Sequence, residues 1–113
     1  MDGRLIAMAQ GKGRAIYLYD NKIVVNEVIN KSIKIKDVIE IRTCKRLWKN
    51  QCIIYYLENK SRKEIIIDIN KNNIIPFLKL EKEFEIIKFQ ISEDIKQKVK
   101  IVEYNENNIM KTI

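Results

Sequence analysis

At 113 residues, 46% of them hydrophobic and 33% charged, the chain is long enough to enclose one hydrophobic core and too short for two. The formal net charge is +7 and the chain has no histidine, which excludes a zinc site of the usual Cys and His ligands and a histidine general base. The first ten residues carry the charges of Asp2 and Arg4, and apolar runs such as residues 53–57 are too short to cross a bilayer, so we expect a soluble, cytoplasmic protein without a signal peptide.

The apolar residues between Arg4 and Asn70 recur mostly at a spacing of two and are rich in Ile, Val and Tyr. This pattern is typical of half-buried antiparallel strands. Short polar clusters divide it into six segments. We therefore predict strands over residues 4–10, 14–19, 22–28, 32–43, 51–58 and 63–69.

Two of the connections between these strands have an informative composition. Gly11-Lys12-Gly13-Arg14 joins the first two strands, and two glycines around a lysine can cradle a phosphate. The segment lacks the glycine spacing and the Ser or Thr of a Walker loop, as well as the third glycine of a dinucleotide loop, so a flexible hairpin turn is favoured. Asp20-Asn21 separates the next two alternating runs. Both residues tolerate positive φ, which predicts a two-residue hairpin.

The connection between the fourth and fifth predicted strands is strongly basic and holds the only tryptophan. We name residues 42–49 the basic tip; it contains Arg42, Lys45, Arg46, Trp48 and Lys49 and no acidic residue. An aromatic ring among cations suits an anionic membrane surface or stacking on a nucleic acid base. The alternative is that Leu47 and Trp48 pack over the end of the core and the cations are merely solvated.

The distribution of the positive charge is more informative than its total. The chain holds 23 Ile, 17 Lys and 11 Asn, which share A/T-rich codons, so genome composition accounts for part of the lysine excess. Residues 1–70 carry 14 Lys and Arg against 8 Asp and Glu, whereas residues 71–113 carry 8 against 7. The basic bias therefore belongs to the region of predicted strands.

After Asn70 the spacing of apolar residues changes from two to three and four. An Asn at position 72 or 73 can cap a helix, Pro76 fits its first turn, and the repeat predicts an amphipathic helix that covers an open end of the sheet. Residues 85–91 fit a helix or a strand. We treat residues 92–113 as a separate C-terminal segment with a cap signal at Ser92 and a polar stretch at 105–108. The repeating apolar residues are Ile74, Phe77, Leu80, Phe84 and Ile87.

Two stretches carry a resemblance to a known family. Ala15-Ile-Tyr-Leu-Tyr-Asp-Asn-Lys-Ile-Val-Val25 is an aromatic hairpin with a polar turn, and in Lys31-Ser-Ile-Lys-Ile-Lys-Asp-Val-Ile-Glu-Ile41 an Ile-x-Ile pair leads into Asp and a hydrophobic residue. Together they resemble the opening of bacterial pleckstrin-homology-like (PH-like) domains, over roughly residues 4–90. The resemblance implies an α+β, mainly β fold: an antiparallel roll or barrel of six to seven strands, capped by a C-terminal amphipathic helix, within residues 1–91.

The PH-like fold hosts lipid, peptide and protein binding, so the resemblance alone does not choose a ligand. We expect a non-catalytic binding or assembly module that contacts a protein partner, or a second copy of itself, through a sheet edge or the helix. The alternative is a binder of anionic membrane or nucleic acid through the basic tip. Phosphoinositide-binding relatives use the loop between their first two strands, which here implicates Lys12 and Arg14.

An enzymatic function has little support in the sequence. We expect no catalytic residue, no metal site and no cofactor, because no Ser or Cys has an evident activating partner. A remote alternative is a Mg²⁺-dependent nuclease that uses Asp37, Glu58 and Lys60 in an Asp…Glu-x-Lys pattern. Glu81, Glu83 and Glu85 are interpreted as a solvated helix face. Cys44 and Cys52 are expected to be reduced, although they could face each other across a hairpin.

Overall fold

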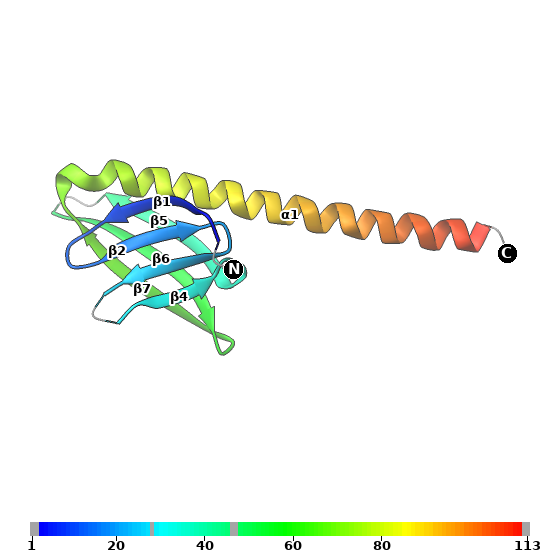
Figure 1. Cartoon of the computed structure of the whole chain (residues 1–113), viewed down its shortest axis with the longest axis horizontal. Coiled ribbons are helices and arrows are strands. Elements are labelled where there is room, and N and C mark those ends of the chain that lie inside the picture. The colour runs from blue at the N-terminus through cyan, green and yellow to red at the C-terminus, as the bar shows by residue number, and fades with distance from the viewer. Residues whose placement is uncertain (1–2, 28, 46–47, 112–113) are drawn as a thin grey trace.

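The computed structural model contains seven antiparallel strands in two sheets, followed by one long helix (Figure 1). It describes residues 3–27, 29–45 and 48–111, and the side chains of these residues up to Gln97. The fold is α+β and mainly antiparallel, as predicted, but the strands form two sheets and not a closed barrel. The first sheet has the order β1 (Leu5–Gln10), β2 (Ala15–Tyr19), β3 (Lys22–Asn26), β4 (Lys31–Lys34), and the second has β5 (Val38–Lys45), β6 (Asn50–Glu58), β7 (Ser61–Ile69).

The predicted strand over residues 32–43 is in fact two strands in different sheets. A 3-10 turn, η1 (Ile35–Asp37), carries the chain from β4 to β5. The Ile35 N–H donates to the Asn21 carbonyl oxygen at 3.1 Å, which ties this turn to the β2–β3 hairpin. The apolar alternation changes phase at the turn, because Val38 is buried and Ile39 is exposed, and the pairing of β5 with β6 is irregular at the same place.

Two strand pairs are joined by two-residue hairpins. The hairpin at Asp20-Asn21 is confirmed, since β2 and β3 flank it and Leu18 pairs with Ile23. The second two-residue hairpin is Asn59-Lys60, between β6 and β7. These are the described non-glycine residues that have positive φ angles, 52° and 65°. Two successive left-handed residues match the right-handed twist of a hairpin, so the β6–β7 connection is tighter than predicted.

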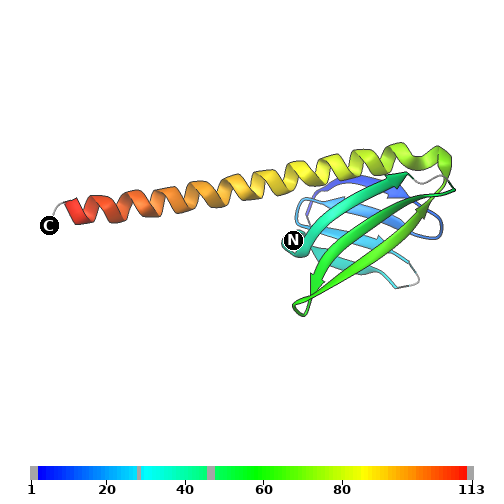
Figure 2. The same cartoon turned by 180° about the vertical axis from the view of Figure 1, so that it is seen from behind.

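The long helix α1 (Ile74–Lys111) follows a 3-10 turn, η2 (Lys71–Asn73), and Pro76 lies in its first turn as predicted. The helix contacts β1 and β5, which are edge strands of the two sheets, and so lies across the opening between them (Figure 1, Figure 2). The predicted apolar face is buried at Phe77, Leu80, Phe84 and Ile87. Residues 85–91 are helical, and the helix continues without a break through residue 92 to Lys111.

The core lies between the two sheets and is closed by the first turns of α1. Its members are mostly branched aliphatic side chains at alternate strand positions, which fill a small space with few rotamers to lose. The largest fully buried side chains include Ile16, Leu18, Ile23, Val25, Ile41, Ile54, Ile67, Phe77 and Leu80.

Glu81 links the helix to the edge of the second sheet. Its Oε2 accepts a hydrogen bond from the Thr43 N–H at 2.9 Å, and the residue is only partly exposed. The interpretation of Glu81 as part of a solvated face is therefore wrong. Because Thr43 lies on the edge strand β5, the carboxylate satisfies a backbone donor that has no neighbouring strand on that side.

The turn between β1 and β2 is packed against β7. The Gly11 N–H donates to the Arg14 carbonyl oxygen and the Lys12 N–H to the Asp68 carbonyl oxygen, each at 2.8 Å. These donors are therefore not available to cradle a phosphate. A Cβ atom on Gly11 would lie 2.4 Å from Ile67 Cγ2 and 2.7 Å from the Asp68 carbonyl oxygen, so only glycine fits.

We predict that Gly11→Ala lowers the free energy of unfolding by about 1–3 kcal/mol, because the added methyl group collides with a fully buried isoleucine and with backbone. Urea denaturation followed by circular dichroism measures this loss. The control is Gly13→Asn in the same turn, where a Cβ meets nothing within 4 Å and Asn tolerates the left-handed φ of 71°. Equal losses for the two variants would contradict packing of this turn on β7.

Candidate functional site

Three connections meet at one end of the two sheets, at the left in Figure 1. They are the β1–β2 turn, the β5–β6 connection and the end of β7. The backbone N–H of Lys12 donates to the carbonyl oxygen of Asp68, and Asn50 of β6 pairs with Ile69 of β7. The sequence placed Lys12 and Arg14 apart from the basic tip. In the structure Lys12 and Arg14 of the first turn and Lys49 of the basic tip come together around Asp68. We name this end of the sheets, with Lys45 and Trp48 of the same connection as Lys49, the basic end (Lys12, Arg14, Lys45, Trp48, Lys49 and Asp68).

Asp68 is the acidic centre of the basic end. The Gln51 side-chain amide donates to Asp68 Oδ1 at 3.0 Å, and Lys49 Nζ lies 3.9 Å from the same oxygen. The pKa of Asp68 is lowered, first by the hydrogen bond from Gln51 and then by the positive charges of Lys49, Lys12 and Arg14. The carboxylate therefore stays ionised and lies near cations from two separate connections.

Arg14 has a structural task within the basic end. Its Nη1 donates to the Ile66 carbonyl oxygen at 2.9 Å, and its Nε lies 3.2 Å from Glu27 Oε1. The guanidinium group thus binds a carbonyl of β7, which is an edge strand, and shares its charge with a carboxylate. Of the two cations predicted in the first turn, Lys12 is the exposed one and the better placed to meet a ligand.

The basic tip is only partly assembled as a cationic surface. Arg42 forms an ion pair of 3.0 Å with Glu40 on the same strand, which offsets its charge. Lys45 and Lys49 are exposed, and Arg46 lies outside the described residues, as does Leu47. Among the described residues, the exposed lysines of the basic end are Lys12, Lys45 and Lys49, and Lys49 is the one that is paired with Asp68.

Trp48 is 86% exposed, so the interpretation that it packs over the end of the core is wrong. A large aromatic ring in water is uncommon in a folded domain, and Trp is among the residues enriched at protein interfaces. Ammonium groups beside an exposed indole can bind phosphate or carboxylate oxygens while the ring packs on an apolar or aromatic group. The chemistry of the basic end is thus suited to contact with an anionic group.

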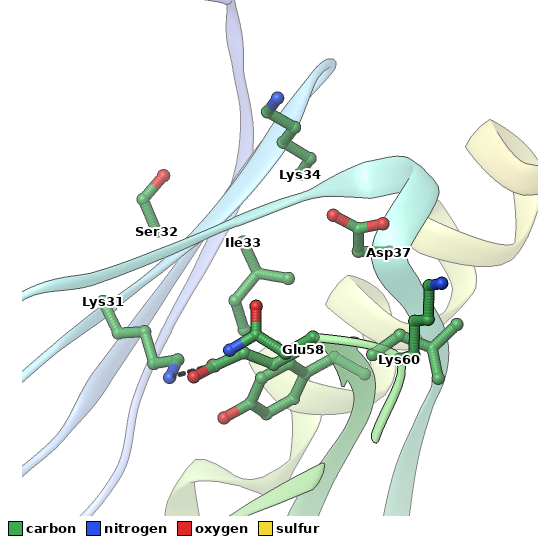
Figure 3. Close-up of a pocket in the computed structure, with 10 residues that line it drawn as sticks. Lys31, Ser32, Ile33, Lys34, Asp37, Glu58 and Lys60 are labelled. Carbon is green, nitrogen blue, oxygen red and sulfur yellow. Dashed lines mark hydrogen bonds and ion pairs between the residues drawn. The ribbon is translucent and has the colours of Figure 1, made fainter. Parts of the chain in front are cut away.

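A cavity of about 460 Å³ lies at the other end of the sheets, between β4, η1 and the β6–β7 hairpin (Figure 3). Asp37, Glu58 and Lys60, the residues of the nuclease hypothesis, all line it. Glu58 points toward Lys31 and away from Asp37 in Figure 3, and Lys31 Nζ lies 2.6 Å from Glu58 Oε2. The hydrogen bond from Lys31 is the main reason that the pKa of Glu58 is lowered.

This geometry does not assemble a Mg²⁺ site from the proposed carboxylates. Two carboxylates that bind one metal ion must converge, whereas Glu58 is engaged by Lys31 and turned from Asp37. Within the described residues, no group of three or more His, Cys, Asp or Glu side chains is placed to hold a metal ion.

The two cysteines lie on opposite faces of the second sheet. In the β5–β6 pairing Thr43 is opposite Cys52 and Cys44 is opposite Gln51, and both thiols are free. Adjacent positions of a strand point to opposite faces, so the idea that Cys44 and Cys52 face each other is wrong. Burial raises the pKa of the Cys52 thiol to about 12, which removes it as a nucleophile near neutral pH.

A second exposed surface lies on α1 beyond the sheets, in residues 88–111, which we name the projecting segment (Figure 1, Figure 2). The apolar stripe of the helix runs into it: Phe84 and Ile87 are 3% and 8% exposed, Ile91 is 38% exposed and Ile95 57%. Phe89 is 65% exposed and lies on the opposite face of the helix, about 200° around the axis from Ile87 and from Ile91. The sequence prediction did not identify this surface because it left residues 85–91 ambiguous and treated 92–113 separately.

Comparison of the chain with protein-family models, with curated protein sequences and with solved structures finds no match in any of the three. Within the part of the chain that the structure describes, no helix combines the length and the apolar character needed to span a membrane. The basic end and the projecting segment are therefore the observations from which we infer function.

We predict that the fluorescence of Trp48, the only tryptophan, is quenched efficiently in the folded protein because the ring is exposed. Iodide should quench more strongly than caesium, since Lys12, Lys45 and Lys49 attract the anion, and the difference should shrink as salt is added. Lys49→Gln should reduce this preference for iodide without changing quenching by neutral acrylamide. Strong protection of Trp48 from acrylamide would contradict its exposure.

Proposed function

We propose that the chain is a non-catalytic module, a PH-like roll with a projecting helix, that binds a protein partner through the apolar stripe of α1. The observation that carries the proposal is the passage of one stripe from burial at Phe84 and Ile87 to exposure at Ile91 and Ile95. Seven antiparallel strands followed by a helix, as the PH-like resemblance implies, support the assignment of the roll.

The exposed stripe favours binding because a free helix of this kind is poorly stabilised. Isolated helices are marginal in water, and most helical stability in proteins comes from packing an amphipathic face. Contiguous apolar surface of this sort on a small domain marks a site of protein contact. The exposed apolar side chains of the stripe are Ile91 and Ile95.

A non-catalytic role is supported by the condition of the groups that could react. Glu58 is paired with Lys31, the Cys52 thiol is buried and protonated, and Asp68 is held between Gln51 and Lys49. Each of these groups has a partner or an environment that stabilises the fold, and together they do not form a proton-transfer pair.

We predict that Ile91→Glu weakens capture of the protein partner by about tenfold or more, measured by pull-down with immobilised full chain. Burial of an aliphatic side chain contributes about 1.5–3 kcal/mol, and each 1.4 kcal/mol is a tenfold change in affinity. Gln90→Glu, which adds the same charge at the adjacent exposed position, should retain capture. If both variants capture the partner as well as the wild type, the stripe is not the binding surface.

A second candidate function, binding to an anionic surface, is favoured by the exposure of Trp48 among Lys12, Lys45 and Lys49. An indole ring is stable at the headgroup level of a membrane, and each lysine near an anionic leaflet contributes about 1 kcal/mol. This interaction uses the basic end and leaves the stripe of α1 free.

For this candidate we predict that binding to vesicles rich in phosphatidylserine falls steeply with added salt and drops on the order of tenfold in Lys45→Glu. Vesicle co-sedimentation measures both effects. Lys36→Glu makes the same charge change at an exposed position in η1, away from the basic end, and should bind nearly as well as the wild type. Binding that is indifferent to salt, or equally reduced in both variants, would count against recognition by the basic end.

A further inference from the structure

The projecting segment raises the question of which partner covers its apolar stripe. Phe84, Ile87, Ile91 and Ile95 occur at spacings of three and four, and the sequence continues this spacing with Val99 and Val102. The stripe that binds the sheets is thus longer than the sheets that cover it. From Lys88 to Lys111 the helix extends for about 36 Å.

We propose that the projecting segment pairs with the same segment of a second copy of this chain in antiparallel orientation, with the two rolls at opposite ends. This inference rests on the proposed function and names its partner. It follows from the low net charge of the segment, from the positive charge of the rolls, which sets the orientation, and from the area that two such helices bury.

The projecting segment is nearly neutral, whereas the rest of the chain is strongly basic. Residues 1–87 carry 17 Lys and Arg against 11 Asp and Glu, and residues 88–111 carry 5 Lys against 4 Asp and Glu. A strongly acidic partner would be attracted to the basic end in preference to this segment. A second copy of the segment carries both signs in nearly equal number, so the pairing meets little net repulsion.

The charge of the rolls favours the antiparallel orientation. Residues 1–87 carry a net charge of +6. Parallel pairing in register would place the two basic rolls side by side. Antiparallel pairing separates the rolls by several Debye lengths, each about 10 Å at 0.1 M salt.

The area available fits a reversible dimer. A helix about 12 Å across with its side chains, covered over a third of its circumference along about 36 Å, loses roughly 450 Å² of surface. Two copies therefore bury roughly 900 Å², slightly less than the roughly 1,000 Å² of a stable specific interface, so we expect weak association that depends on concentration.

Sedimentation of the full chain from micromolar to several hundred micromolar tests the pairing. We expect a shift from monomer to dimer across this range, and Ile95→Glu should raise the midpoint at least tenfold. Ile95 is 57% exposed and belongs to the projecting segment, so the circular dichroism and thermal unfolding of the roll should be unchanged in this variant. Gln97→Glu adds the same charge about 200° around the helix and should dimerise like the wild type.

A distance between two spin labels tests the orientation. Labels on Lys111→Cys, in a Cys44→Ser background that leaves only the buried Cys52, should lie about 30 Å apart in an antiparallel pair centred near residue 100. A parallel pair would bring them to about 10 Å, the separation of packed helix axes, and would overturn the proposed orientation.

The self-pairing and the proposed function fail in different ways. A wild-type chain that stays monomeric throughout the concentration series, or an Ile95→Glu variant that dimerises as well as the wild type, overturns the self-pairing. Capture of a different protein that depends on Ile91 would then still uphold the proposed function. If neither Ile91→Glu nor Ile95→Glu changes the capture of any partner or the dimerisation, the proposed function is overturned as well.

Discussion

The burial of one helix face across the edges of two small sheets is the interaction on which the rest of the structure depends. A sheet of four strands and a sheet of three each have one apolar face, and neither can exclude water from it alone. Phe77, Leu80 and Phe84 fill the opening beside β1 and β5, and Glu81 binds the free N–H of Thr43. Because a helix is stiff, this contact also fixes the direction in which the residues after Ile87 leave the domain.

The periodicity of the sequence predicted most of the elements, and the errors have local causes. A spacing of two up to Asn70 and of three and four after it identified the strand region and the helix, since burial of one face imposes those periods. The break between β4 and β5 was not predicted because apolar residues continue through η1. The hairpin at Asn59-Lys60 was missed because a lysine in the left-handed conformation is uncommon.

The candidate sites were less predictable than the fold because they depend on contacts between distant residues. The sequence identified Lys12, Arg14 and Lys49, but nothing in it indicated that the β1–β2 turn docks on β7 and brings all three toward Asp68. Gly11 permits the close packing of this turn on β7, whereas the composition of the turn suggested only flexibility. The sequence also left the exposure of Trp48 undecided. An indole beside both apolar and charged neighbours can be buried or exposed to solvent, and only the packing around it decides.

The basic end and the projecting segment lie at opposite ends of the domain, and this arrangement makes the two proposed interactions compatible. The basic end surrounds the end of β7, close to where α1 begins, whereas the projecting segment leaves the sheets at the far end of the same helix (Figure 1). In an antiparallel pair of segments the two basic ends would therefore face outward, on a rod about as long as two domains and one shared helix. Two weak cationic sites fixed on one rigid body bind an extended anionic surface more tightly than either site alone, because the second contact becomes intramolecular. Assembly through the stripe would thus strengthen binding of the basic end to an anionic surface without any change in the residues of the basic end.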